Sequence, residues 1–375
     1  MGSLGYRMTV EAEGVEARQA WRELVEQNPG VALSKTPEWL DCIQGCTRFT
    51  DASLLFRIED GRRVLLPRLR SPALPGLFAS PPDNWNLGAD ASGFLTEGGP
   101  LEPELVRALV KEVGRAGLRT QVVVGGDDAR QWQPAVPTEV HSVTHHADVL
   151  DLDGEFSTVW EKRFTSKVRS ASRKAERRGV TIVSDSTGRL IPAFDVLYRG
   201  SVHRWARDRR YPVRLMGWRY RREHPRSRFE SVARALGGRC TVWMAWWNGA
   251  PVASIMVLTR GDQVTYWRGA MDKERCRGSG ANELLHRYAI EAACDDGRRS
   301  YDFGLSQTDD LRRFKRAFGT HEVPVHTYIL ERIPTAAAEA RCYETAKRTL
   351  LAVTRRVRGA GTLARSACAG MRLPR

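Results

Sequence analysis

The sequence lacks the long apolar runs of a membrane protein. No stretch of the 375 residues approaches the roughly eighteen apolar residues that span a bilayer. The first residues, MGSLGYRMTVEAEG, lack the positively charged and then apolar pattern of a secretory signal. We therefore expect a cytoplasmic protein without a membrane span.

Cysteine is scarce and scattered. The seven cysteines are an odd number and include no CxxC pair. This pattern argues against a disulfide framework or a zinc ribbon and indicates reduced thiols. The histidines of "HHAD", from His145, lack the i, i+4 spacing of a helical metal site. We therefore expect no metal.

Positive charge is abundant. Lys and Arg together number 59 against 44 Asp and Glu, which gives a formal net charge of +15. Such an excess attracts polyanions, so nucleic acid, a nucleotide-bearing substrate or a membrane surface are candidate partners. The arginine bias of a high-GC genome is an alternative source of part of this excess.

The first third of the chain predicts a mixed α/β domain. A length of 375 residues and a hydrophobic content of 42% suit two domains with real cores. Strand-like runs flank the turn Glu59-Asp60-Gly61, and a helix with Pro103 in its first turn ends near Gly117. The predicted elements are helices at about 11–27, 36–45 and 102–117, strands on both sides of 59–61, and a strand at 119–126.

The second part opens near Asp151 with an amphipathic helix that ends at Gly179. A buried stripe and a basic remainder are predicted for it. The apolar residues Trp160, Phe164, Val168, Ala171 and Ala175 are spaced four, four, three and four apart.

Hairpin turns then mark a run of strands. Asn248-Gly249 joins the first two and Arg260-Gly261-Asp262 the next two. The predicted elements after Gly179 are a helix at 191–206, a basic stretch, strands at 240–247, 251–259 and 263–271, a helix at 281–296, a strand at 299–304, a helix at 309–318 and a strand at 322–330.

This element order resembles the GNAT acyltransferase fold, and the first half has a similar order. We therefore expect an α/β protein with an α+β type of mixed sheet and two tandem GNAT-like domains. The predicted ranges are a degenerate domain at 8–150, an acyltransfer domain at 151–334, and a basic C-terminal helix and tail at 335–375.

A glycine-rich loop lies between a predicted strand and a predicted helix. In "ERCRGSGANELL", Gly278 and Gly280 let the backbone approach phosphate oxygens at a helix N-terminus, and Arg275 and Arg277 add positive charge. GNAT enzymes hold the pyrophosphate of coenzyme A with this pattern. A plain tight turn is the alternative interpretation.

The end of the second half resembles the FemABX family of aminoacyltransferases, which use aminoacyl-tRNA. The resemblance lies in "YDFG" followed by Leu-x-x-Phe-Lys-x-x-Phe-Gly, and it covers roughly 151–332, with weaker likeness in 30–126. It implies that Phe314 and Lys315 lie at the transfer site. Arg204 would match a family arginine that contacts substrate phosphate.

Lys315 suits that role chemically. Aminolysis of an ester develops negative charge on the carbonyl oxygen, and a cation held among aromatic rings stabilises this charge. The alternative is an exposed lysine between two core anchors, Phe314 and Phe318. Asp302 as a base and Ser306 as a hydroxyl donor are further catalytic candidates, and a turn carboxylate is the alternative for Asp302.

Basic segments predict a surface for RNA. Ten arginines between His203 and Arg228 alternate with aromatic residues, as in proteins that grip single-stranded RNA ends. A solvated arginine-rich loop is the alternative. The candidate tRNA-binding residues of the first basic helix are Lys167, Arg169, Arg173 and Lys174, and Asn84, Trp85 and Asn86 are candidates for the acceptor pocket.

The sequence thus predicts an aminoacyltransferase that moves an amino acid from aminoacyl-tRNA to an amine of a small-molecule, peptide-like or cell-wall precursor acceptor. We expect a monomer with no tightly bound cofactor. One alternative is an N-acyltransferase that uses acetyl-CoA. A second alternative is an RNA-binding module without catalysis.

Overall fold

A computed structural model describes residues 6–70, 78–80, 93–98, 101–209, 211–223 and 225–332, together with 341, 342, 345 and 349. The predicted acceptor-pocket residues Asn84, Trp85 and Asn86 lie outside the described residues, as does almost all of the predicted C-terminal helix and tail.

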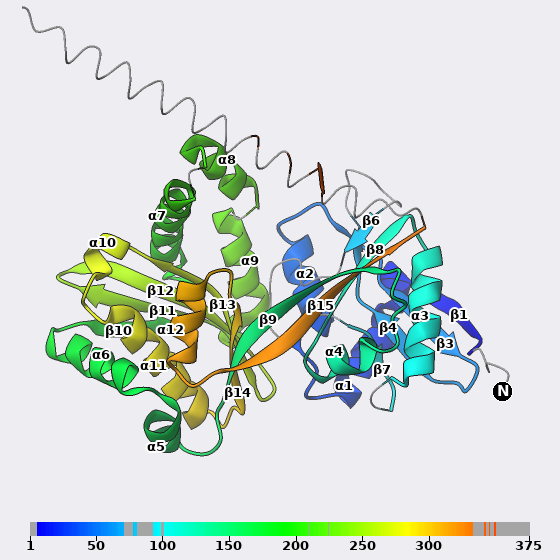
Figure 1. Cartoon of the computed structure of the whole chain (residues 1–375), viewed down its shortest axis with the longest axis horizontal. Coiled ribbons are helices and arrows are strands. Elements are labelled where there is room, and N and C mark those ends of the chain that lie inside the picture. The colour runs from blue at the N-terminus through cyan, green and yellow to red at the C-terminus, as the bar shows by residue number, and fades with distance from the viewer. Residues whose placement is uncertain are drawn as a thin grey trace, which may run out of the picture.

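The N-terminal half combines a small sheet with the start of a larger one (Figure 1). The predicted helix at 11–27 is shorter than expected, because strand β1 and a 3-10 turn occupy its first part. The elements are β1 (Met8–Glu13), α1 (Arg18–Gln27), α2 (Pro37–Gln44), β2 (Thr50–Asp51), β3 (Leu54–Ile58), β4 (Arg63–Leu66), β5 (Leu69–Arg70), β6 (Phe78–Ser80), β7 (Leu95–Thr96), α3 (Pro103–Arg115), β8 (Arg119–Gly125), α4 (Gly126–Trp132) and β9 (His141–Asp151).

The C-terminal half contains every strand and helix predicted after Gly179 and adds β10, α8, α9 and the short helix α10. Strand β10 was not predicted, and the basic stretch expected between 206 and 240 contains two helices, α8 and α9. The elements are α5 (Phe156–Thr158), a π-helical turn (Val159–Arg163), α6 (Ser166–Arg177), β10 (Thr181–Asp185), α7 (Ile191–Asp208), α8 (Val213–Glu223), α9 (Arg226–Leu236), β11 (Cys240–Trp247), β12 (Ala250–Arg260), β13 (Gln263–Met271), α10 (Lys273–Cys276), α11 (Ala281–Asp295), β14 (Ser300–Leu305), α12 (Asp309–Arg316) and β15 (His321–Glu331).

Local sequence accounts for several of these boundaries. The Thr36 hydroxyl accepts the Trp39 amide at 3.3 Å and so caps α2, while Pro37 and Pro103 occupy first turns. At the β11–β12 turn, Asn248 and Gly249 have φ of 50° and 75°, as the predicted two-residue hairpin requires.

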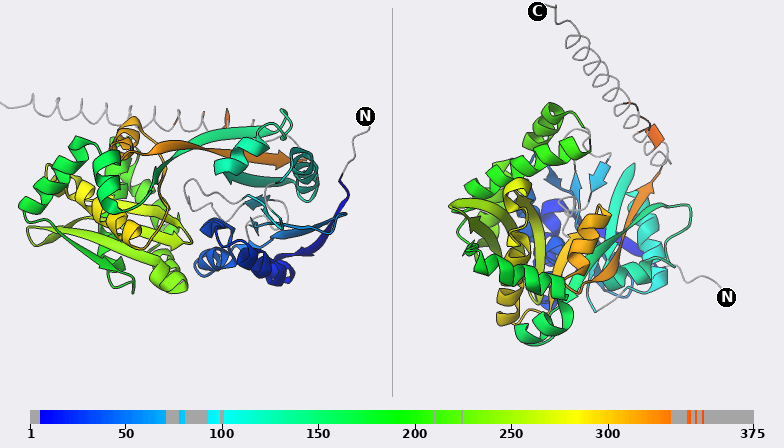
Figure 2. Two further views of the ribbon diagram at one scale, coloured as in Figure 1. Left: turned by 90° about the horizontal axis from the view of Figure 1, so that it is seen from below. Right: turned by 60° about the vertical axis from the view of Figure 1, so that its left-hand side comes forward.

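One mixed sheet runs through both halves. In the described part of the chain its 11 strands follow the order β10-β11-β12-β13-β14-β9-β15-β8-β6-β5-β2, and a separate sheet has the order β1-β3-β4-β7. Strand β15 pairs with β9 along 321–329 and with β8 along 325–331. Both views of Figure 2 show β15, in orange, passing from one half to the other.

The core is layered on the faces of this sheet. On one face α6 and α11 pack against β12 and β14 through buried residues such as Val168, Leu284 and Phe303. On the other face residues of both halves share a single cluster, which includes Trp21, Trp39, Phe194, Phe229 and Trp267. The predicted boundary near residue 150 therefore falls where the two halves share a sheet and a core.

The amphipathic helix predicted from 160 to 178 is interrupted. Phe164 has extended backbone (φ −70°, ψ 133°) and separates the π-helical turn from α6. The predicted stripe is nevertheless largely buried, since Phe164 and Val168 are each 2% exposed and Ala175 is fully buried.

Candidate active site

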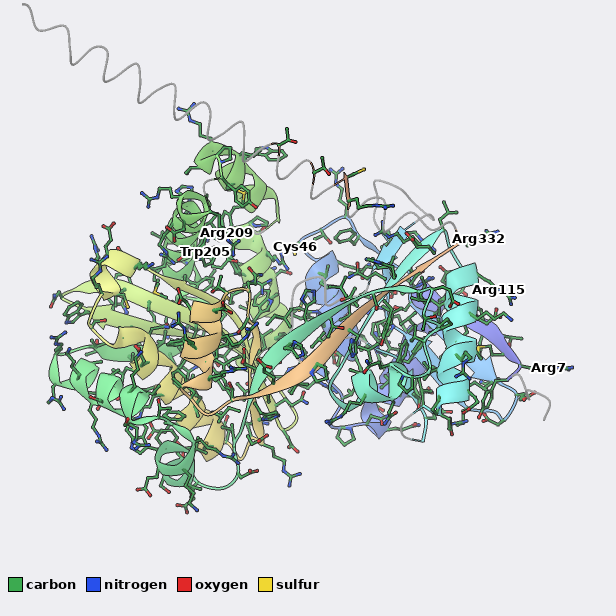
Figure 3. All side chains as sticks on the ribbon, viewed as in Figure 1. Arg7, Cys46, Arg115, Trp205, Arg209 and Arg332 are labelled. Carbon is green, nitrogen blue, oxygen red and sulfur yellow. The ribbon has the colours of Figure 1, made fainter. Side chains whose placement is uncertain are left out.

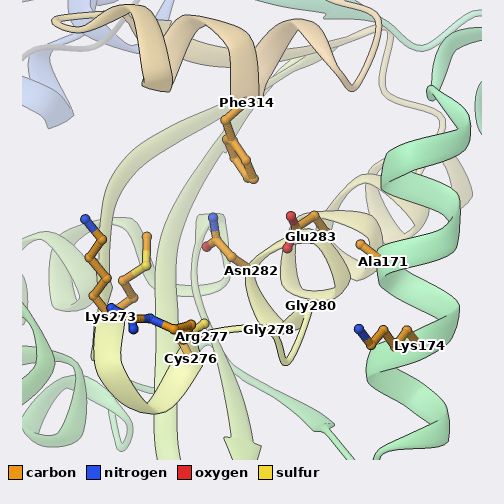
Figure 4. Close-up of a pocket in the computed structure, with 11 residues that line it drawn as sticks. Ala171, Lys174, Lys273, Cys276, Arg277, Gly278, Gly280, Asn282, Glu283 and Phe314 are labelled. Atoms are coloured by element: carbon orange, nitrogen blue, oxygen red, sulfur yellow. The ribbon is translucent and has the colours of Figure 1, made fainter.

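A pocket of about 460 Å³ lies where the loop between α10 and α11 meets α6 and α12 (Figure 4). The glycines Gly278 and Gly280 form its floor, and Phe314 points toward the loop from α12. The polar side chains that line it are Lys174, Lys273, Arg277, Asn282 and Glu283.

The loop has a fixed shape because its own side chains tie it down. Asp272 accepts the amides of Glu274 and Arg275 at 3.2 and 3.1 Å and caps α10. The Ser279 hydroxyl donates to the Cys276 carbonyl at 2.7 Å and accepts the Ala281 amide at 3.0 Å.

Gly280 must be glycine for two reasons. Its φ is 75°, and a Cβ atom there would lie 2.4 Å from the Ala171 carbonyl oxygen of α6. The loop therefore packs its backbone directly against α6. This contact brings Lys174, one turn beyond Ala171, to the pocket.

The pocket suits an anionic group. It lies at the N-terminus of the 15-residue helix α11, where backbone dipoles favour negative charge. Three cations, Lys174, Lys273 and Arg277, line it against one carboxylate, Glu283. Of the predicted phosphate-binding set, Arg277, Gly278 and Gly280 line the pocket, whereas Arg275 does not and pairs with Asp272 at 3.5 Å.

Strands β13 and β14 separate next to this pocket. Their parallel ladder ends at Thr265 and Asp302, although β13 continues to Met271 and β14 to Leu305. Met271 lines the pocket. The separated ends thus create a gap in the sheet beside the cationic loop.

Arg204, predicted to contact substrate phosphate, anchors the end of β13. It is half-buried on α7, and Nη1 donates to the Met271 carbonyl at 2.6 Å. Burial lowers the pKa of this guanidinium. The side chain therefore lies beside the pocket rim but is committed to the backbone.

Phe314 and Lys315 face different surroundings. Phe314 enters the pocket and packs against His286 and Phe318, with ring centroids 5.7 and 5.3 Å away. Lys315 is 1% exposed, and its Nζ donates to the carbonyls of Gly304 and Leu305 at 2.7 and 2.9 Å. The alternative interpretation of Lys315 as an exposed lysine is therefore wrong.

Burial lowers the pKa of Lys315 to about 8, and the nearby carboxylates of Asp148 and Asp302 oppose this effect. Lys315 Nζ lies 3.8 Å from Asp148 Oδ2. The Ser306 hydroxyl donates to the same Asp148 oxygen. Asp302 accepts the Gly304 amide at 2.6 Å, which is the turn-forming alternative for this carboxylate.

Sequence reasoning missed Asp148. It is 1% exposed on β9 and joins Ser306 and Lys315 from elements far apart in the chain. A carboxylate within the otherwise apolar run Ala147–Leu150 was the only sequence signal for it. Lys273, Asn282 and Glu283 were also missed, because they flank the glycines of the loop without belonging to its motif.

The predicted tRNA-binding residues of α6 divide into three groups. Lys174 lines the pocket, and Lys167 is exposed on the surface. Arg169 donates to the carbonyls of Trp160 and Glu161 at 3.2 Å each, and Arg173 lies over the Trp160 ring at 5.6 Å. The last two therefore stabilise the π-helical turn.

The arginine-rich stretch is helical and only partly exposed. Trp205 and Trp218 are 38% and 52% exposed, and Figure 3 shows Trp205 of α7 near Arg209, the residue that directly follows this helix. Tyr220 is buried and donates to Asp195 at 2.8 Å, and Arg228 is 4% exposed. The aromatic residues predicted to stack on bases thus include one core residue.

Two general features bear on the chemistry. Among the described residues, no cluster of three or more His, Cys, Asp or Glu side chains has a metal-binding arrangement. No described helix is long and apolar enough to cross a membrane.

His286 is buried beside Tyr301, and burial lowers its pKa to about 3, so it is neutral at physiological pH.

Part of the C-terminal half matches a known family model. Residues 162–316 match the family model described as the acetyltransferase (GNAT) domain. The matched range contains α6, the glycine-rich loop, and both Phe314 and Lys315. No curated protein sequence matches the chain.

Most of the chain is similar in fold to solved structures of low sequence identity. FemX has 14% identity and a TM-score of 0.56, with 87% of this chain and 98% of that chain covered. The C-terminal domain of a protein named as a lysylphosphatidylglycerol synthetase from Agrobacterium fabrum has 12% identity and a TM-score of 0.50, with 88% and 95% covered. A conserved protein of unknown function from Bacteroides thetaiotaomicron has 9% identity and a TM-score of 0.52, with 85% and 99% covered.

Proposed function

On the premise that residues 162–316 form a GNAT acyltransferase domain within a FemX-like fold, we propose that the chain transfers an amino acid from aminoacyl-tRNA to an amine. The acceptor is a small-molecule, peptide-like or cell-wall precursor amine. The observation that carries the proposal is the cationic pocket at the start of α11, which adjoins both Phe314 and the gap between β13 and β14. The reaction belongs to the cytoplasm, where aminoacyl-tRNA is found.

The pocket holds the phosphates at the acceptor end of the donor. Lys174, Lys273 and Arg277 supply charge, and the loop glycines allow close backbone approach. Phe314 offers a ring face on which the terminal base can stack. The ester carbonyl of the donor then lies toward the gap between the strands.

Lys315 acts at the edge of that gap. Its hydrogen bonds to Gly304 and Leu305 fix the end of β14, and its buried charge favours negative charge that develops nearby. Proximity supplies much of the remaining rate enhancement, because an activated ester reacts readily with a well-placed amine.

Basic helices favour tRNA over a smaller donor. The exposed Lys167 on α6 and the exposed Trp205 and Trp218 on α7 and α8 lie outside the residues that line the pocket. A charged surface of this kind suits a long polyanion. Coenzyme A remains the second candidate donor, because the loop at the start of α11 equally suits a pyrophosphate.

Single-turnover transfer with the purified chain tests the donor. We expect product from charged tRNA, abolished by ribonuclease, and none from acetyl-CoA. Transfer from acetyl-CoA alone would assign the second donor. RNA binding without transfer from either donor would favour a binding module.

The pocket cations give a sharper prediction. Lys174→Ala and Lys273→Ala each remove one phosphate contact, so we expect the KM for the donor to rise about tenfold, equivalent to roughly 1.4 kcal/mol. Lys111→Ala, at an exposed position of α3, is the matched control and should leave the KM unchanged. Equal KM values for all four proteins would place the donor elsewhere.

A further inference from the structure

A largely buried polar cluster includes Lys315, the residue that follows Phe314 on α12. Asp148 of β9 and Lys315 of α12 are each 1% exposed, and Ser306, in the connection from β14 to α12, is half-buried. Ser306 is therefore the member of the cluster that solvent or a substrate can reach.

Hydrogen bonding fixes the direction of the Ser306 hydroxyl. Its proton is donated to Asp148 Oδ2, so its lone pairs are available to accept a hydrogen bond. The other oxygen, Asp148 Oδ1, is buried and has no hydrogen-bond partner among the described residues. Asp148 thus has capacity for a proton that its present contacts do not use.

Helix α7 locates Ser306 relative to the gap. Arg204 holds the end of β13 through the Met271 carbonyl, and five residues later Arg209 donates to Gln307 at 3.2 Å, next to Ser306. Helix α7 and the residue that directly follows it therefore contact the end of β13 and the segment just after β14. Ser306 itself directly follows Leu305, the last residue of β14, and so lies at the end of one of the two separated strands.

We propose that Ser306 contacts the acceptor amine and that Asp148, acting through Ser306, receives the proton that the amine loses. The inference rests on the acyl transfer proposed above and adds a place for the acceptor. Ser306 is then a catalytic residue, and Asp148 is a positioning residue that sets the direction of its hydroxyl.

The proton and the bonds balance within one transfer. The amine nitrogen forms a bond to the ester carbonyl carbon, and the bond from that carbon to the donor oxygen breaks. The amine proton moves to Ser306 Oγ while the Ser306 proton moves to Asp148. Asp148 then returns this proton through Ser306 to the leaving oxygen, which becomes the free hydroxyl of the donor.

Several charged or titratable groups lie around Asp148. Lys315 lies 3.8 Å away on α12, and Glu322 of β15 is opposite it in register but is paired with Arg316 at 2.7 Å. Asp302 on β14 faces Lys315. His146 is two residues earlier on β9, and His286 of α11 adjoins Lys315.

The test compares Asp148→Asn, Ser306→Ala, Ser306→Thr and the double variant Asp148→Asn/Ser306→Ala. Rates are measured as kcat/KM for the acceptor against pH, with whichever donor the wild type uses. The identity of that donor tests the proposed function. The variants test the proton relay, that is, the transfer of the amine proton through Ser306 to Asp148. Asp151→Asn on β9 and Ser300→Ala on β14 are matched controls.

We expect Asp148→Asn and Ser306→Ala each to lower kcat/KM about 100-fold, as loss of a general base does, and to flatten the acidic limb of the pH profile. The double variant should be no slower than either one, Ser306→Thr should keep most activity, and the donor KM should not change. An unchanged pH profile, or losses that multiply in the double variant, would overturn the relay. If Asp148→Asn unfolds, Ser306→Ala still decides, because it leaves the pair of Asp148 and Lys315 intact.

Discussion

Lys315 shows at the residue scale how burial changes an ordinary side chain. Its ammonium is saturated by two backbone carbonyls and a carboxylate, so its charge is held in place within the protein. The motif around it was visible in the sequence, and so was its aromatic neighbour Phe314. Its partner Asp148 was not, because a contact between residues 148 and 315 depends on how β9 and α12 pack.

The lowered pKa of Lys315 predicts a pH-dependent stability. Between pH 8 and its ordinary pKa of 10.5, the unfolded chain keeps a proton that the folded chain has released. The free energy of unfolding should therefore rise with pH across this window, relative to Lys315→Met, by up to about 1.4 kcal/mol per pH unit. Below pH 8 both states hold the proton and the difference is constant.

Urea unfolding of the wild type and Lys315→Met at pH 7, 8, 9 and 10 measures this difference. Other groups that titrate in this range are common to both proteins and cancel. Parallel curves for the two proteins would mean that Lys315 titrates normally in the folded state.

At the element scale, the junction of the glycine-rich loop with α6 is the tightest contact of the site. In Gly280→Ala the new Cβ would meet the Ala171 carbonyl. We therefore expect the free energy of unfolding to fall by about 3 kcal/mol, because the backbone is strained and α6 is displaced. Gly278→Ala, at φ 70°, meets nothing nearer than Arg178 Nη1 at 3.9 Å and should lose only about 1 kcal/mol. Chemical denaturation measures the free energy of unfolding of both variants. Equal losses of stability would show that α6 moves to accommodate the new Cβ at little cost.

Periodicity and turn chemistry predicted the elements whose patterns are local. The β11–β12 hairpin and helices α2, α3 and α11 follow from Asn-Gly, Pro and Gly residues at their ends. Strand β9 was missed because its first half, His141–His146, is polar and becomes a strand only by pairing with β15. The interruption at Phe164 was missed because its burial preserves the stripe that a continuous helix would show.

At the scale of the whole molecule, the two halves share one sheet and one core. Strand β9 pairs with both β14 and β15, and the shared core joins Trp21 and Trp39 to Phe229 and Trp267. We therefore expect a fragment starting at residue 151 to lack fixed tertiary packing, because it loses β9 and half of that core. Near-ultraviolet circular dichroism and calorimetry of the fragment and the full chain measure this. A folded fragment with its own sharp transition would show that the second half is autonomous.

Strand β15 follows every other described strand in the chain, yet it lies between β9 and β8 near the middle of the large sheet. While the ribosome is still making the protein, the facing edges of β8 and β9 therefore remain open and able to pair with other nascent chains. Chaperone protection during synthesis should matter more for this protein than for one whose central strands are made first. A premature stop before residue 321 would leave both edges exposed permanently.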